Sequence, residues 1–158
     1  MFKKVLVGYD GSTGARVALD GAAALAKQFG SEITALFVRG PLPNYSDLPG
    51  EFEGEAEAAE NEIAERQLDV ASVMAQHGLL IRCETCMGDP AKSIVQHAAQ
   101  GCYDLIVIGH SGHSEIWGRL LGDTADRISD HAHCSVLVIK SGARSARLPY
   151  HNEPAHSV

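Results

Sequence analysis

Residues 109–127 read GHSGHSEIWGRLLGDTADR and include the glycines Gly109, Gly112 and Gly122. The apolar run DLIVI over 104–108 comes before it and predicts a buried strand. A helical pattern, Thr124–His131, follows it. We therefore expect a glycine-rich loop that leads from the end of a strand to the start of a helix.

Such a loop is suited to bind a phosphate-sized anion. Glycine adopts positive φ and lets backbone N–H groups approach a ligand closely, and a helix N-terminus adds unpaired N–H donors and a partial positive charge. A surface loop that only turns the chain has the same composition, so both interpretations stay open at this point. The stretch is not a P-loop, because no Gly-Lys-Ser/Thr follows, and it lacks the GxGxxG spacing.

Strand-like runs recur along the rest of the chain and alternate with helical patterns. Short Val/Leu/Ile-rich segments predict strands, and the fifth of them precedes a polar, patternless tail over 141–158 that we expect to be flexible. The expected strands are Lys3–Tyr9, Ile33–Val38, Leu79–Cys86, Tyr103–Ile108 and Val136–Ile139.

The helical patterns have clear ends. Gly30 stops the first helix and Gly78 the second, which we expect over roughly Glu53–Gln76. Asp89 and Pro90 are suited to be the N-cap and first residue of the third helix. The expected buried faces are Ala18, Ala22, Leu25 and Phe29 in the first helix, Ala59, Ile63, Val70, Val73 and Met74 in the second, and Ala91, Ile94, Val95 and Ala98 in the third.

The alternation predicts an α/β fold: an open, five-stranded parallel sheet with helices on both faces, joined by right-handed crossovers. Ligands of such sheets bind beyond the carboxyl ends of the strands, where the strand order reverses. If the first and fourth strands are neighbours, Asp10-Gly11-Ser12 and the Gly109 loop flank that crevice. A carboxylate there can accept hydrogen bonds from a ribose or an amino group, which fits a nucleotide with its phosphates on the glycine loop.

Composition narrows the function classes. The 158 residues are enough for one domain with a substantial core, and no run reaches the ~18 apolar residues of a membrane span. The net charge is −7, and eight acidic residues over 51–69, beside one basic residue, account for the whole imbalance. We expect that segment to be a solvated helix face, and the lack of a basic patch disfavours nucleic acid as a partner. The short apolar N-terminus predicts a first strand in a cytoplasmic protein, not a signal peptide.

The cysteines and histidines predict no metal site. Cys83 and Cys86 form a CxxC, but residues i and i+3 of a strand point to opposite faces, and no second CxxC is present to complete a zinc site. The cluster His131-Ala132-His133-Cys134 is also expected to be incidental. His110 and His113 alternate with Ser111 and Ser114, yet nothing places the third, orienting group that a nucleophile needs, so no catalytic residue is predicted.

The chain resembles a single-domain universal stress protein over about residues 2–140, which predicts one domain over 1–140. Four segments carry the resemblance: VLVGYDGS, GDPAKSIVQHA, DLIVIGHSGHS and LLGDTADRISDHAHCSVLVIK. The ATP-binding members of that family carry Gly-x2-Gly-x9-Gly-Ser/Thr, and Gly109, Gly112 and Gly122 match this spacing.

The resemblance implies a Rossmann-like sheet of strand order 3-2-1-4-5 and a homodimer paired through the last strand, Val136, Leu137, Val138 and Ile139. It also implies an adenine nucleotide (ATP, ADP or AMP), with or without Mg2+, in the switch-point crevice. By position, Asp10 would contact the base or ribose and Val38 would offer its backbone to adenine. Ile108 would line the site, and the phosphates would lie on Gly109, Gly112, Gly122, Asp123 and Thr124.

Asp123 departs from the family pattern, which has Ser or Thr there. A hydroxyl can donate to phosphate, whereas an ionised carboxylate cannot, and two unit charges about 5 Å apart repel by roughly 3 kcal/mol at an effective dielectric near 20. Asp123 is also suited to cap the last helix and so to occupy the N–H groups that a phosphate needs. Thr124 offers a hydroxyl one residue later.

Three functions follow, in order of preference. The first is a cytoplasmic, nucleotide-binding sensor or regulator of a stress response. The second is a dimeric stress protein that binds no nucleotide and acts through an unidentified protein partner, and the third is a slow ATP hydrolase or a nucleotidyl transferase. The glycine spacing favours the first and Asp123 favours the second. The only tryptophan, Trp117, is expected either to pack over the loop or to cover the ligand.

Overall fold

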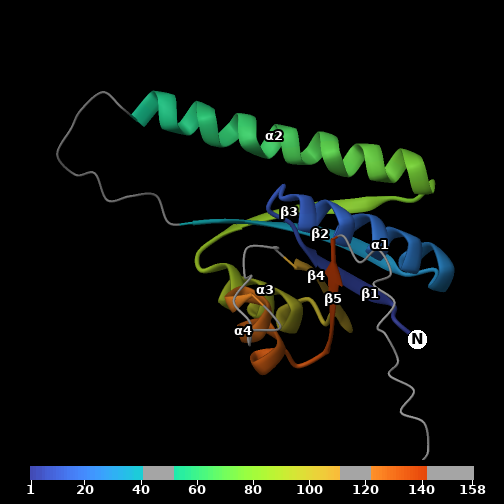
Figure 1. Ribbon diagram of the computed structural model, residues 1–158. Coiled ribbons are helices and arrows are strands. Elements are labelled where there is room, and N and C mark those ends of the chain that lie inside the picture. The colour runs from blue at the N-terminus through green and yellow to red at the C-terminus, as the bar shows by residue number, and fades with distance from the viewer. Residues whose placement is uncertain (41–51, 111–121, 142–158) are drawn as a thin grey trace, which may run out of the picture.

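A computed structural model describes residues 1–40, 52–110 and 122–141 of the chain (Figure 1). Strands and helices alternate in it throughout. The strands are β1 (Lys4–Gly8), β2 (Glu32–Arg39), β3 (Ile81–Met87), β4 (Leu105–His110) and β5 (Ser135–Lys140). The helices are α1 (Thr13–Phe29), α2 (Phe52–His77), α3 (Pro90–Gln100) and α4 (Asp123–His131). The predicted α/β class is confirmed.

The strands form one parallel sheet in the order β3-β2-β1-β4-β5, as predicted. β1 lies between β2 and β4, with Val5 opposite both Ile33 and Leu105. Because the chain moves outward from β1 to one side first and then to the other, the strand order reverses between β1 and β4. The carboxyl ends of these two strands therefore flank a crevice.

Helices cover both faces of the sheet: α1 and α2 lie on one side, and α3 and α4 on the other (Figure 1). Side chains of β1 alternate between the two cores, since Val5 and Val7 belong to the cluster under α1 and Leu6 to the cluster under α3. The central strands are buried on both faces, which explains the nearly unbroken hydrophobic runs of β1, β2 and β4.

Alanine lets α1 lie close to the sheet. Its buried face consists of Gly14, Ala15, Ala18, Leu19, Ala22, Ala23 and Ala26. Gly30 ends the helix with a left-handed φ of 65°, as predicted. Phe29 was expected in the buried stripe, and this is wrong: its side chain is 50% exposed and packs edge-on against the ring of Phe2. Phe29 is the last residue of α1, so few neighbouring residues remain to cover its ring.

The acidic helix α2 is the outer layer on the α1 side. Of its predicted stripe only Val70 is fully buried, while Ile63, Val73 and Met74 pack partly against the core. Glu57, Glu60, Glu62 and Glu65 are exposed, which confirms the solvated face. Near its end, His77 pairs with Asp20 of α1 (Nε2 to Oδ1, 2.7 Å).

β3 and β4 each begin two residues later than predicted. Leu80 precedes β3 and is 85% exposed. Ahead of β4, the hydroxyl of Tyr103 donates to Thr34 (3.0 Å), and Asp104 accepts from the backbone amide of Lys3 (2.7 Å). β4 also runs two residues beyond the predicted Ile108, so Gly109 and His110 belong to a strand.

Candidate functional site

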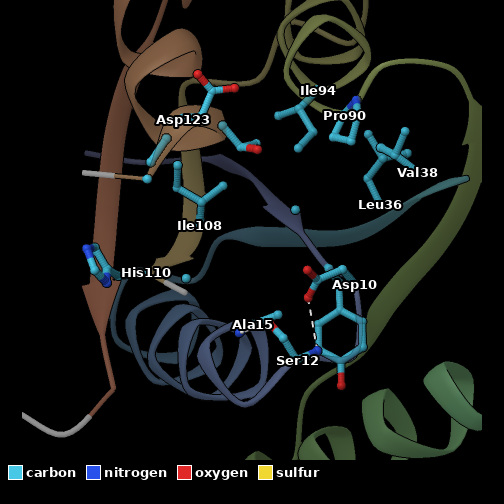
Figure 2. Close-up of a pocket in the computed structure, with 16 residues that line it drawn as sticks. Asp10, Ser12, Ala15, Leu36, Val38, Pro90, Ile94, Ile108, His110 and Asp123 are labelled. Carbon is cyan, nitrogen blue, oxygen red and sulfur yellow. Dashed lines mark hydrogen bonds between the residues drawn. The ribbon is translucent and has the colours of Figure 1, made fainter. Parts of the chain in front are cut away.

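A pocket of about 350 Å³ lies at the carboxyl ends of β1 and β4, where the topology predicts one (Figure 2). Its volume is in the range of small-molecule sites. The described lining residues come from five segments of the chain: 8–15, Leu36 and Val38 of β2, Pro90 and Ile94 of α3, 108–110 of β4, and 122–125 at the start of α4.

The turn after β1 holds its shape through its own side chains. The carboxylate of Asp10 accepts from the amide of Ser12 (2.9 Å), drawn dashed in Figure 2, and Gly11 has a φ of 80°, which favours glycine. The hydroxyl of Ser12 then accepts from the amide of Ala15 (3.2 Å) and caps α1. The turn thus presents the predicted site residue Asp10 at the pocket.

The second predicted residue, Val38, contributes a free backbone edge. The β1–β2 ladder ends with the amide of Tyr9 donating to the carbonyl of Leu36 (3.0 Å). Backbone groups alternate between the two edges of a strand, and the carbonyl of Arg39 accepts from Gly88 on the β3 side (2.8 Å). Val38 therefore directs its N–H and C=O toward the space that β1 leaves when the chain turns at Asp10, and this space is the pocket.

Aliphatic side chains make the wall beside this edge. Leu36, Val38, Pro90 and Ile94 gather on one side of the pocket in Figure 2. Asp89 fixes this wall, because it is the N-cap of α3 and accepts from the amide of Lys92 (2.9 Å). The predicted cap and the predicted first helical residue, Pro90, are both confirmed. A flat, apolar group fits between the wall and the free edge of Val38.

Gly109 lines the pocket, but its lack of a side chain has a second use. A Cβ placed there would lie 2.3 Å from the carbonyl carbon and oxygen of Gly14 and 2.6 Å from the amide nitrogen of Ala15. The first turn of α1 therefore packs directly on the end of β4, which only glycine permits. The phosphate role inferred for Gly109 from the sequence is accompanied by a packing role that the sequence did not reveal.

The start of α4 supplies backbone N–H donors on the side of the pocket opposite Asp10. Asp123 was considered as the cap of this helix, and this is wrong: Gly122 is the N-cap, without a side-chain cap, and Asp123 is the first helical residue. The amide of Asp126 is the first to bond within the helix, to the carbonyl of Gly122 (2.9 Å). The amides of Asp123, Thr124 and Ala125 precede it and have no partner within the helix, so among the described residues they are donors that a ligand at this helix end can use.

The described lining carries carboxylates and no lysine or arginine. Asp10 and Asp123 lie on opposite sides of the pocket (Figure 2), and His110 lines it at the end of β4. The nearby Arg127 is committed to Asp89, with Nη1 to Oδ2 at 3.0 Å and Nη2 to Oδ1 at 2.7 Å. This arginine holds the pKa of Asp89 below its usual value. The described lining therefore offers an anion backbone amides, hydroxyl groups and the His110 ring, but no lysine or arginine.

The model of the "Universal stress protein family" matches residues 1–140. This chain belongs to the universal stress protein family. A universal stress protein of Methanocaldococcus jannaschii is 34% identical over 142 residues, which cover 89% of this chain and 83% of that protein. One of Bacillus subtilis is 31% identical over 148 residues, or 89% of this chain and 100% of the relative.

A solved universal stress protein in complex with cAMP has the same fold. Its TM-score is 0.69 at 26% identity, and the match covers 87% of this chain and 97% of that one. The crevice at the β1–β4 switch point thus belongs to a fold that is shared with a protein known to hold an adenine nucleotide.

The structure of this universal stress protein brings most of the predicted site residues together. Asp10, Val38, Ile108, Gly109, Gly122, Asp123 and Thr124 all line one pocket. Gly112 lies outside the described residues, as do Ser111, His113, Ser114 and Trp117. The tail beyond residue 141 lies outside them too, so its predicted flexibility remains a prediction.

Sequence analysis missed several lining residues, namely Gly8, Tyr9, Ala15, Leu36, Pro90, Ile94 and Ala125. Pro90 and Ile94 were recognised only as helix signals, whereas Ser12 was expected at the crevice as part of the Asp10 turn. A stronger signal was present for Ser12, because it stands three residues before Ala15 at a helix start, where hydroxyl side chains serve as N-caps.

The cysteines behave as the strand geometry predicts. Cys83 packs in the α1–α2 core and Cys86 in the α3–α4 core, so the CxxC points to opposite faces of the sheet. Burial raises the pKa of the Cys83, Cys86 and Cys134 thiols. Among the described residues no group of histidines, cysteines and carboxylates is arranged to hold a metal ion, and no helix is long and apolar enough to cross a membrane.

Proposed function

We propose that this universal stress protein is a cytoplasmic sensor or regulator of a stress response that binds an adenine nucleotide in the β1–β4 pocket. One observation carries the proposal. The backbone edge of Val38, the aliphatic wall beside it and the first amides of α4 all line one pocket. This arrangement suits a ligand with a hydrogen-bonding aromatic base at one end and an anion at the other.

Each part of the nucleotide has a place. The base lies against Leu36, Pro90 and Ile94 and pairs with the backbone of Val38. The ribose hydroxyls donate to the carboxylate of Asp10, and the phosphate accepts from the amides of Asp123 and Thr124. The solved relative in complex with cAMP supports adenine as the base.

Charge favours a ligand with few negative charges. Asp123 places a carboxylate beside the amides that receive the phosphate, and the described lining offers no cationic side chain to offset it. AMP, ADP or a cyclic monophosphate is therefore preferred to metal-free ATP. Mg2+ offsets the additional charge of ATP, because a hard cation binds phosphate and carboxylate oxygens together.

We further propose that the protein is a homodimer joined through β5. Both β3 and β5 are edge strands of the described sheet. β3 carries Arg82 and Glu84, charges of the kind that protect an edge from pairing, whereas Val136–Ile139 of β5 is uncharged and only partly buried. The second candidate function, a nucleotide-free dimer that acts through a protein partner, is favoured by the carboxylate of Asp123 alone.

Native mass spectrometry of the protein as purified tests the dimer and a co-purifying nucleotide together. Calorimetric titration with AMP, ADP, cAMP and ATP then measures affinity, each with and without Mg2+. Saturable binding of an adenine nucleotide supports the first function. A dimer that binds none of these ligands moves the conclusion to the nucleotide-free function.

A further inference from the structure

One turn of α2 contacts the Asp10 turn from behind. Asp69 accepts from the hydroxyl of Tyr9 (2.7 Å), the residue just before the turn. It also pairs with Arg16 in the first turn of α1, just after it (Nη2 to Oδ2, 3.1 Å). A single carboxylate of α2 thus joins both ends of the segment that presents Asp10 and Ser12.

Arg66 completes this contact three residues earlier on the same side of α2. Its Cγ and Nε lie 3.7 Å from the position that a Cβ on Gly11 would occupy, so the arginine side chain lies against the middle of the turn. Only 12% of the Arg66 side chain is exposed, and Glu62 one turn before accepts from its guanidinium. The turn is therefore supported at its start, its middle and its end by two neighbouring residues of α2.

The support extends into the pocket itself. Tyr9 is 2% exposed, lines the pocket, and packs its ring against Phe37 at 5.8 Å between centroids. A buried hydroxyl needs a partner, and Asp69 supplies it. Loss of Asp69 removes the acceptor of that hydroxyl and the ion-pair partner of Arg16, while the local bonds of the turn, Asp10 to Ser12 and Ser12 to Ala15, remain possible.

We propose that Asp69 of α2 is a positioning residue of the nucleotide site, which holds the Asp10–Ser12 turn through Tyr9 and Arg16. The inference rests on the proposed function for its effect on affinity. Its effect on the turn is independent of any ligand. By reciprocity, a nucleotide that fixes the turn also tightens the docking of α2, because a coupling free energy acts equally in both directions.

The experiment compares Asp69→Ala and Asp69→Asn with a matched control, Asp20→Ala. Asp20 also ties α1 to α2, through His77 and Gln76, but it lies one turn further along α1 than Arg16 and does not line the pocket. Asparagine keeps an acceptor for Tyr9 and loses the charge for Arg16, so it provides a milder variant that retains the fold if the alanine variant unfolds. Hydrogen exchange of the Ser12 and Ala15 amides is measured without ligand, and AMP affinity by calorimetry.

Asp69→Ala should accelerate exchange at both amides and weaken AMP roughly tenfold, within the range for residues that touch neither coupled ligand directly. Asp69→Asn should give a smaller change in the same direction, and Asp20→Ala should leave both measurements at the parent values. Unchanged exchange in both Asp69 variants, or equal acceleration in Asp20→Ala, overturns the inference even if the parent binds AMP. Accelerated exchange in the Asp69 variants of a protein that binds no nucleotide upholds the positioning role and refutes the proposed function instead.

Discussion

Gly109 at the end of β4 lies against the backbone of Gly14 in α1, so closely that a Cβ on Gly109 would be 2.3 Å from the Gly14 carbonyl. Gly109, which lines the pocket, and the start of α1, which Ser12 caps, therefore pack directly on each other. Ser12 caps this helix and Asp10 precedes it, so a shift of α1 would also move the turn that presents the carboxylate.

Gly109→Ala should destabilise the protein by about 3 kcal/mol, at the upper end of the usual cost of overpacking, because the clash is with backbone that cannot rotate away. Urea unfolding measures this free energy. Gly40→Ala is the control, since nothing lies within 4 Å of its Cβ position, and it should change stability by less than about 0.5 kcal/mol. Equal stability of the two variants would mean that α1 does not pack on β4 as described.

Gly112→Val should have the opposite profile, with nucleotide binding lost and the fold intact. Gly112 lies outside the described residues, and its predicted role comes from the family spacing alone. A side chain there would fill the space through which backbone amides meet phosphate. Calorimetry measures binding and circular dichroism the fold. Binding at the parent affinity would show that Gly112 does not contact the phosphates.

Asp123→Ser should raise the affinity for metal-free ATP by roughly 1 to 2 kcal/mol. The change removes a charge beside the phosphate and adds a donor, and solvent and salt reduce the bare repulsion to this size. The parent should prefer AMP or ADP to metal-free ATP, and Mg2+ should restore ATP binding. Titrations of both proteins with and without Mg2+ provide the test. Tight metal-free ATP binding by the parent would show that the Asp123 carboxylate points away from the phosphates.

Tyr9→Phe should remove part of the alkaline instability of the protein. Burial, assisted by the hydrogen bond to Asp69, raises the pKa of Tyr9 from 10.0 to about 12. Between these values the unfolded chain has released the phenolic proton and the folded protein still holds it, so the free energy of unfolding falls as pH rises from about 10 to about 12. Unfolding curves across this range should fall less steeply for Tyr9→Phe than for the parent. Parallel curves would place Tyr9 in contact with solvent.

Val138→Pro should weaken the dimer if the Val138 amide donates across the interface, because proline removes a backbone donor from the middle of β5. Analytical ultracentrifugation at micromolar concentration reports the assembly state, and circular dichroism confirms that the variant is folded. Thr85→Pro introduces the same change in β3, at the other edge of the sheet, and should leave the dimer intact. A parent protein that sediments only as a monomer contradicts the proposed interface.

Sequence patterns predicted the central strands well because burial on both faces gives them a distinctive apolar composition. The order of the strands followed from the family resemblance, since no local pattern in β1 or β4 states which strand lies beside it. Contacts between distant residues were out of reach for the same reason. Nothing near Asp69 in the sequence points to Tyr9, sixty positions away, and the clash that requires glycine at position 109 exists only after α1 has folded back onto β4.

The sequence identified the N-cap of α3 correctly, where a side chain caps the helix, and misassigned the N-cap of α4, where no side chain does. Asp89 caps α3 as predicted, with Pro90 next to it. At α4 the only candidate cap, Asp123, is the first residue of the helix, and glycine occupies the cap position. Glycine is an accepted N-cap, but the sequence offers a more common cap residue one position later, and the pattern alone favours the wrong one.

The bidentate ion pair between Arg127 and Asp89 bears on the size of the ligand that the pocket can hold. Asp89 begins the helix that carries Pro90 and Ile94, while Arg127 belongs to the helix that begins with Asp123. The ion pair thus links the helix that carries the apolar wall to the helix that carries the amide donors. The distance between these two parts of the pocket is therefore a property of the protein. If the proposed nucleotide binds here, the distance between its base and its phosphate has to match the distance between these two parts of the pocket.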